Sequence, residues 1–146
     1  MRLIFYPLLV AAVASCSTAN PPTAPDATPL PAGAPLVPTA PIATGVFVRT
    51  GYAVTGSATL TVSGRSARLE LSSDFTIGSA PGPVVYLNTT NNPNSGQPLR
   101  IGPLQRLSGS QTYDFQIPEG VRYTWVLIWC DPFNVGMAQA FIMPTP

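Results

Sequence analysis

The 146-residue sequence contains no histidine and no lysine, and it has only two cysteines, Cys16 and Cys130. Without histidine the chain cannot by itself build a Ser/His/Asp or Cys/His triad, a His-based zinc site or a His-ligated haem. Only 9% of the residues are charged and the formal net charge is +1, which gives no electrostatic reason to expect a nucleic-acid partner. No spacing of cysteine and carboxylates suggests a metal site, so we expect no bound metal.

The first fifteen residues are typical of an export signal. Arg2 precedes a short apolar run from Leu3 to Val13, which Pro7 interrupts and which is too short for a membrane span of about 20 residues. The run ends in Val13-Ala14-Ser15-Cys16, which resembles the bacterial lipobox, where the cysteine is acylated and becomes the new N-terminus. We expect a signal peptide over 1–15 and acyl groups such as palmitate on Cys16; an ordinary secretory peptide with an incidental Cys16 is the alternative.

Acyl chains on Cys16 would fix the protein to a membrane, because each buried methylene contributes about 0.8 kcal/mol. Ser17 after the cysteine resembles the outer-membrane sorting pattern of bacterial lipoproteins. We therefore expect a lipid-anchored protein of the bacterial cell envelope, on the outer membrane and facing the periplasm if the host has two membranes.

Residues 16–44 are expected to form the lipidated cysteine and a tether. The stretch 17–44 contains eight prolines, interleaved with alanine and threonine, and one charged residue, Asp26. So many missing N–H donors and fixed φ angles exclude a helix or a sheet ladder and favour extended polyproline II. We expect a disordered, semi-rigid linker that holds the domain some tens of Å from the bilayer. A ligand for a proline-binding module is the less favoured interpretation.

Residues 45–146 are expected to form one domain made of strands. Apolar residues alternate with polar ones at a period of two, which is typical of half-buried strands, and Gly64-Arg65 supplies a hairpin turn. The run Val121–Cys130 has few polar positions, so it should be a central strand covered on both faces. The spacing of these strands predicts an all-β fold, an antiparallel β-sandwich. The clearest alternations are 58–63, 67–71, 112–117 and 138–142.

Several short motifs in this domain resemble, in their order, the DM thirteen family, also called the electron-transfer DM thirteen family. The motifs are Val54–Ala58, Gly82–Leu87, Ile101–Leu104, Gly109–Tyr113 and Ile128-Trp129-Cys130. The chain departs from the family pattern at Val84, where an Asp is usual, and at Tyr52, where a His is usual. The resemblance implies an all-β domain outside the cytoplasm with a redox role centred on the cysteine of the Trp-Cys pair, here Cys130.

Two roles for Cys130 stay open on chemical grounds. Cys130 shares its strand face with Val126 and Ile128, which favours a buried core residue. Asp131-Pro132 ends the strand directly after it, so the thiol could instead lie at the rim, where a partner or cofactor could reach it. With Cys16 acylated, no disulfide partner remains in the mature chain.

We therefore expect an envelope lipoprotein with an electron-transfer role through Cys130 as its catalytic residue. The alternative is a non-enzymatic binding or scaffolding lipoprotein in which Cys130 is purely structural. The expected partners are the membrane and an unidentified redox protein; the sequence identifies no cofactor, and a stand-alone enzyme is not expected. We expect two sets of side chains to have no direct part in function. The arginines are expected on the solvated surface, and the aromatic residues Tyr86, Tyr113, Trp125, Trp129 and Phe133 in the core.

Overall fold

The computed structural model describes residues 19–145, so the predicted signal peptide and Cys16 lie outside the described residues. The described chain is almost entirely β-structure, with one short 3-10 helix, η1 (Asp131–Phe133). The strands are β1 (Ala43–Arg49), β2 (Val54–Thr55), β3 (Ser57–Ser63), β4 (Ser66–Leu71), β5 (Thr76–Ile77), β6 (Pro83–Asn88), β7 (Leu99–Pro103), β8 (Gln111–Gln116), β9 (Trp125–Cys130), β10 (Val135–Phe141) and β11 (Met143–Pro144). This confirms the expected all-β class.

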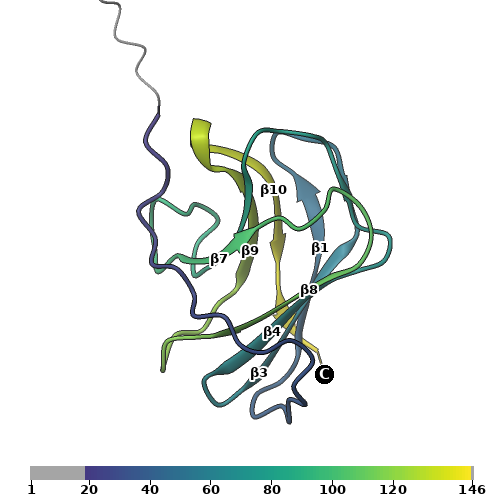
Figure 1. The fold of residues 1–146 in the computed structure, drawn as a ribbon, viewed down its shortest axis with the longest axis vertical. Helices are drawn as coiled ribbons and strands as arrows, with labels where there is room; N and C mark the ends of the chain where they lie inside the picture. Colours follow the sequence, from purple (N-terminus) through teal and green to yellow (C-terminus); the bar gives the residue numbers. More distant parts are fainter. Residues whose placement is uncertain (1–18, 146) are drawn as a thin grey trace, which may run out of the picture.

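Nine of the strands form one antiparallel sheet that curves until it is nearly closed (Figure 1), and β2 and β5 pair as a separate two-stranded sheet. Its strand order is β7-β6-β9-β10-β1-β3-β4-β8, with β11 also paired to β1. The sandwich-like halves meet at β1, whose first residues pair with β3 and β11 and whose last residues pair with β10. The expected sandwich is therefore a single sheet folded over on itself, and β9 lies between β6 and β10 as predicted for a central strand.

Gly45 marks the point where β1 changes partners. A Cβ atom at Gly45 would lie 2.1 Å from the backbone carbonyl oxygen of Phe141. Real side chains cannot approach a carbonyl so closely, so only glycine permits β1 to lie this close to the end of β10. The chain can thus pass from one half of the sheet to the other without a break.

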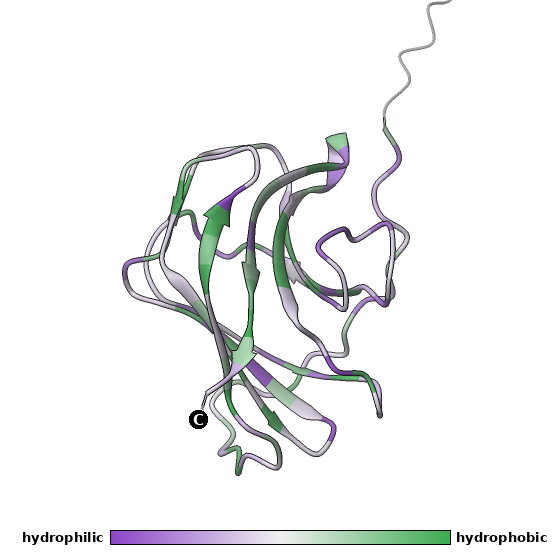
Figure 2. Cartoon of the chain, turned by 180° about the vertical axis from the view of Figure 1, so that it is seen from behind, coloured by the Kyte–Doolittle hydropathy of each residue, from purple (hydrophilic) through white to green (hydrophobic). Residues whose placement is uncertain are grey.

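The core lies between the two halves, and the predicted alternations place their apolar residues inside it. The inward residues are buried in each predicted alternation: Ala58 and Leu60; Ala67, Leu69 and Leu71; Tyr113, Phe115 and Ile117; Ala138, Ala140 and Ile142. Phe47 and Phe75 meet edge to face at 5.4 Å between ring centroids. Figure 2 shows the hydrophobic stretches running along the strands that surround this core.

The outer face of β6 and β9 carries a second apolar cluster. Val84, Tyr86 and Leu127 are buried there, and Trp125, Trp129 and Ala24 pack against them. Ala24 comes from the proline-rich segment, which runs down this side of the sheet in Figure 1. Both faces of β9 are therefore covered, as its low polarity predicts.

The structure differs from the expected unattached spacer between Pro25 and Leu30. The N–H of Ala27 donates to the carbonyl of Arg100 on β7, and the N–H of Arg100 donates to Pro25. At the opposite edge of the sheet, the N–H of Leu30 donates to the carbonyl of Asp114 on β8, and the N–H of Gln116 donates to the carbonyl of Thr28. Proline lacks a donor but keeps its carbonyl, so an extended proline-rich chain can still pair wherever its other residues supply the N–H groups. This segment bridges the two edge strands of the sheet.

Within residues 19–145, no helix is long and apolar enough to cross a membrane.

Candidate functional site

Cys130 is the last residue of β9 and lies beneath the loop that leads into β6. Its side chain is 1% exposed, and Sγ donates a hydrogen bond of 2.9 Å to the carbonyl oxygen of Pro81. Pro81 and Gly82 are themselves exposed, so the hydrogen-bond partner of the thiol lies in a surface loop. In the described chain Cys130 is a free cysteine, and it belongs to the main core cluster.

Asp131 follows Cys130 directly, but its carboxylate is engaged on the opposite, outer face of the sheet. There it accepts a hydrogen bond of 2.7 Å from the hydroxyl of Tyr86, and Nε of Arg100 lies 3.2 Å from its other oxygen. Arg100 also pairs with Asp26 at 3.3 Å. The negative charge beside Cys130 is thus balanced by Arg100, and the thiol itself has only a neutral carbonyl as partner.

Burial raises the pKa of Tyr86 well above its ordinary value of 10, and the hydrogen bond to Asp131 raises it further. Tyr86 is fully buried, so its phenol stays protonated and acts as a donor. The Tyr86–Asp131–Arg100 group is therefore a fixed hydrogen-bonded unit that ties η1 to β6 and β7. Through Asp26 it also fastens the proline-rich segment.

A second ion pair fastens the same segment farther along. Nε of Arg68 lies 2.7 Å from Oδ1 of Asp114, and Arg68 also donates to the carbonyl of Ala34. The N–H of Gly33 donates to the other carboxylate oxygen of Asp114. The assignment of all arginines to solvated surface is therefore wrong for Arg68 and Arg100, whose side chains are half-buried.

The aromatic residues divide into three environments. Tyr86 and Tyr113 are buried, as expected. Trp125 and Trp129 are half-buried on the outer face, and Trp129 donates from its indole nitrogen to Asn134. Phe133 in η1 is 58% exposed, which contradicts its expected place in the core. Its position in a 3-10 turn, after the strand has ended, removes it from the alternating pattern.

The polar loop Asn91–Gly96 is organised by a buried side chain, Asn88. Its Nδ2 donates to the carbonyls of Asn92 and Ser95, and its Oδ1 accepts from the N–H of Thr89. Asn88 is fully buried, so these contacts make its side chain a structural feature of the loop.

Among residues 19–145, no cluster of three or more His, Cys, Asp or Glu side chains is placed to hold a metal ion. Sequence patterns indicated Cys130 but missed the group that Tyr86, Arg100 and Asp26 form with the adjacent Asp131 on the outer face. These residues come from separate parts of the chain, and nothing in their local sequence marks them as partners.

The geometry defines a small antiparallel β-domain of nearly closed, barrel-like form, with one buried cysteine at the end of a central strand. A family model described as Electron transfer DM13 matches residues 46–142. The chain belongs to this family, which confirms the resemblance seen in its motifs. No curated protein and no solved structure matches the chain. The segment that bridges the edge strands, Pro25–Leu30, lies outside the matched region.

Proposed function

We propose that this protein is an envelope lipoprotein that presents an electron-transfer domain at a membrane surface, with Cys16 as the acylated anchor and Cys130 as the redox group. The observation that carries the proposal is membership of the Electron transfer DM13 family over residues 46–142. The lipobox-like sequence before Cys16 supports the anchor.

The attachment of the proline-rich segment sets how far the domain can lie from the anchor. Ala24 already packs on the outer face of the sheet, which leaves only residues 17–23 between the domain and Cys16. At about 3.1 Å per residue in polyproline II, such a stretch reaches about 20 Å. We therefore propose that the domain is held close to the bilayer rather than at the end of a long spacer.

The redox step we propose is thiol–disulfide exchange. The sulfur of Cys130 forms a bond to one sulfur of a disulfide on a partner protein, whose own S–S bond breaks. The departing sulfur takes up the proton that Cys130 gives up, so the domain gains a mixed disulfide and the partner gains one thiol. The exposed Pro81 and Gly82 are the residues that must move to admit the partner.

The burial of Cys130 favours a second function, a non-enzymatic binding lipoprotein in which the cysteine only packs the core. The thiol is 1% exposed and is satisfied by the Pro81 carbonyl, as expected of a structural cysteine. No cation contacts it among the described residues, whereas reactive thiols generally have one nearby.

Thiol labelling of the intact lipoprotein separates these two functions, because acylated Cys16 has no free thiol. A small maleimide is reacted with the native protein, and the rate is compared with that of global unfolding. The redox proposal predicts labelling faster than unfolding, further acceleration in Pro81→Gly, and a mixed disulfide after equilibration with oxidised glutathione. Labelling only at the unfolding rate, with no mixed disulfide in either protein, would establish the structural role. Recovery of a Cys16→Ala variant in the membrane fraction at the wild-type level would disprove the anchor.

A further inference from the structure

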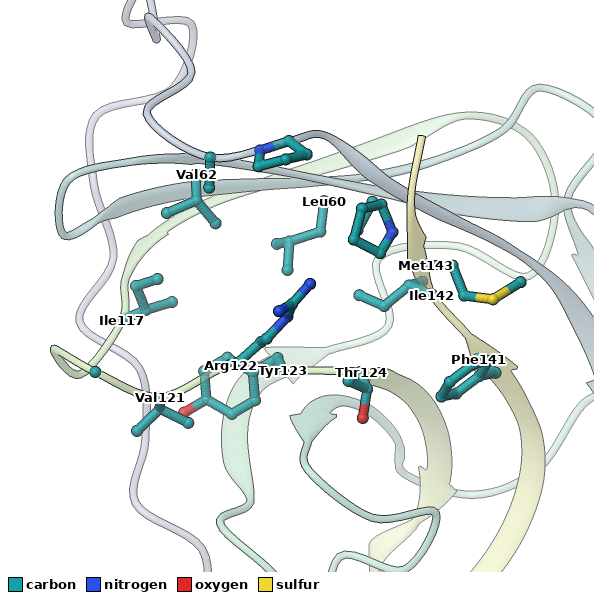
Figure 3. A pocket seen from close by; sticks show the side chains of 15 residues that line it. Leu60, Val62, Ile117, Val121, Arg122, Tyr123, Thr124, Phe141, Ile142 and Met143 are labelled. Carbon is teal, nitrogen blue, oxygen red and sulfur yellow. The ribbon is translucent and has the colours of Figure 1, made fainter. Parts of the chain in front are cut away.

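An apolar cavity opens at the end of the domain opposite Cys130. Its volume is about 670 Å³, within the range of about 300–1,000 Å³ typical of small-molecule sites. Its walls come from β3, the loop that leads into β9, the end of β10 with β11, and the chain before β1. Leu60, Val62, Ile117, Val121 and Ile142 are among the apolar side chains that line it, as Figure 3 shows.

The cavity wall contains one charged side chain, Arg122. In Figure 3 its guanidinium extends from the loop into the space below Leu60. Arg122 forms no ion pair within the described chain; Asp26, Asp114 and Asp131, the carboxylates in ion pairs there, bind Arg68 and Arg100. An exposed guanidinium at an apolar wall provides a charge for an anionic group to neutralise.

Tyr123 adds a second polar group to the same wall. Only 6% of this residue is exposed, and its hydroxyl has no hydrogen-bond partner among residues 19–145. Burial raises its pKa, so the hydroxyl stays protonated and can donate to a ligand. No buried side-chain oxygen or nitrogen among residues 19–145 lacks a partner, so this hydroxyl is itself accessible and is free to bond with water or with a ligand.

We propose that this cavity binds a small amphipathic carboxylate, such as a fatty acid, whose chain fills the apolar space and whose carboxylate pairs with Arg122. The apolar walls match the chain, and the single guanidinium matches a single negative charge. A neutral apolar molecule would leave Arg122 without a partner and would gain no specificity from it. The site is independent of Cys130, because β9 places about 16 Å between Trp125 at one end and Cys130 at the other.

The test is photo-crosslinking of the intact protein in lipid nanodiscs with a diazirine-bearing dodecanoic acid. The bilayer then serves as a reservoir for the probe, and mass spectrometry of the peptides reports where it was bound. Adducts are expected in residues 117–124 and 141–144, which line the cavity. Arg122→Gln should lower the yield of these adducts about threefold to fivefold, the size of one exposed ion pair. Arg106→Gln, which removes an exposed arginine elsewhere, is the matched control and should leave the yield unchanged.

Two further measurements make the outcome decisive. The methyl ester of the same probe lacks the negative charge and should label the cavity as weakly as the acid labels Arg122→Gln. Ala40→Trp places a large ring at the exposed rim and should lower labelling by the acid without touching the sheet. Adducts spread over the surface, or equal labelling by acid and ester in both arginine variants, would overturn the proposal and leave only non-specific hydrophobic adsorption.

Discussion

The backbone N–H of Ala27 lies 2.7 Å from the carbonyl oxygen of Arg100, although the two residues are far apart in the sequence. This contact joins a proline-rich segment to β7, an edge strand of the sheet. Within the next three residues, Thr28 to Leu30, the same segment pairs with β8, the other edge strand. Unpaired edges are prone to pair with other chains, so the segment both closes the fold and protects its edges.

Ala27→Pro should destabilise the protein strongly. Proline removes the N–H that donates to Arg100, and its ring also crowds a position that is buried. We expect a loss of about 2–3 kcal/mol in the free energy of unfolding, measured with urea. Hydrogen exchange should also accelerate at the amide of Arg100, which donates back to Pro25.

Ala27→Gly is the matched control, because it keeps the N–H and removes only a methyl group. Its cost should be about 1 kcal/mol, and the amide of Arg100 should stay protected. Equal destabilisation by glycine and proline, with no change in exchange at Arg100, would mean that the segment does not close the sheet in solution.

The local pattern of the strands was predictable, whereas the closing segment was not. Period-two alternation is a property of neighbouring residues, so it identified the hairpin at Gly64-Arg65 and the inward face of β8. The pairing of Ala27 with Arg100 leaves no such trace, because a single backbone contact needs no particular side chain. Strand order likewise depends on long-range pairing that local sequence does not encode.

In the candidate site, too, the features that depend on neighbouring residues were predictable and the long-range contacts were not. Cys130 was proposed from the Trp-Cys motif of the resemblance and from its lack of a disulfide partner, and its burial follows from sharing a face with Val126 and Ile128. The Arg100–Asp131 pair joins residues of β7 and η1 that meet only after folding. Asp131 therefore gave no sign that its charge would be balanced on the outer face.

The protein should lose stability steeply in alkali, because three buried tyrosines keep their protons in the fold. Burial raises the pKa of Tyr113 to about 12 and raises those of Tyr86 and Tyr123. In the unfolded chain these phenols ionise near pH 10, so above that pH the unfolded state binds fewer protons than the native state. The stabilisation that these three tyrosines contribute is then fully present below pH 10, and it is lost as the pH rises through their native pKa values.

Each such tyrosine should contribute a slope of up to about 1.4 kcal/mol per pH unit between its two pKa values. The free energy of unfolding in urea, measured from pH 9 to 11.5, gives the summed slope of all three tyrosines. Tyr113→Phe should make the fall shallower, because it removes one of the phenols whose pKa is raised in the fold. Identical slopes in wild type and Tyr113→Phe would contradict a raised pKa for Tyr113.

Asn88→Asp should disrupt the loop Asn91–Gly96. The Nδ2 group of Asn88 donates to two backbone carbonyls, and a carboxylate in its place would face both of them without a proton. A buried charge opposite acceptors should cost about 3 kcal/mol or more. Asn91→Asp adds the same charge to an exposed residue of the same loop and should change stability by less than about 0.5 kcal/mol. Similar unfolding free energies for the two variants would show that the buried amide does not organise the loop.

Gly45→Ala should be the most damaging single-methyl change in the sheet. The added Cβ would lie 2.1 Å from the carbonyl oxygen of Phe141, a backbone atom that no side-chain rotation can move away. Either β1 or β10 must shift, and with it the junction between the two halves of the sheet. We expect a loss of about 3 kcal/mol or more in thermal or urea unfolding. Thr44→Ala, one residue earlier on the same strand, removes atoms instead of adding them and should cost about 1 kcal/mol or less. If Gly45→Ala unfolded like Thr44→Ala, β1 could not lie as close to the end of β10 as the structure places it.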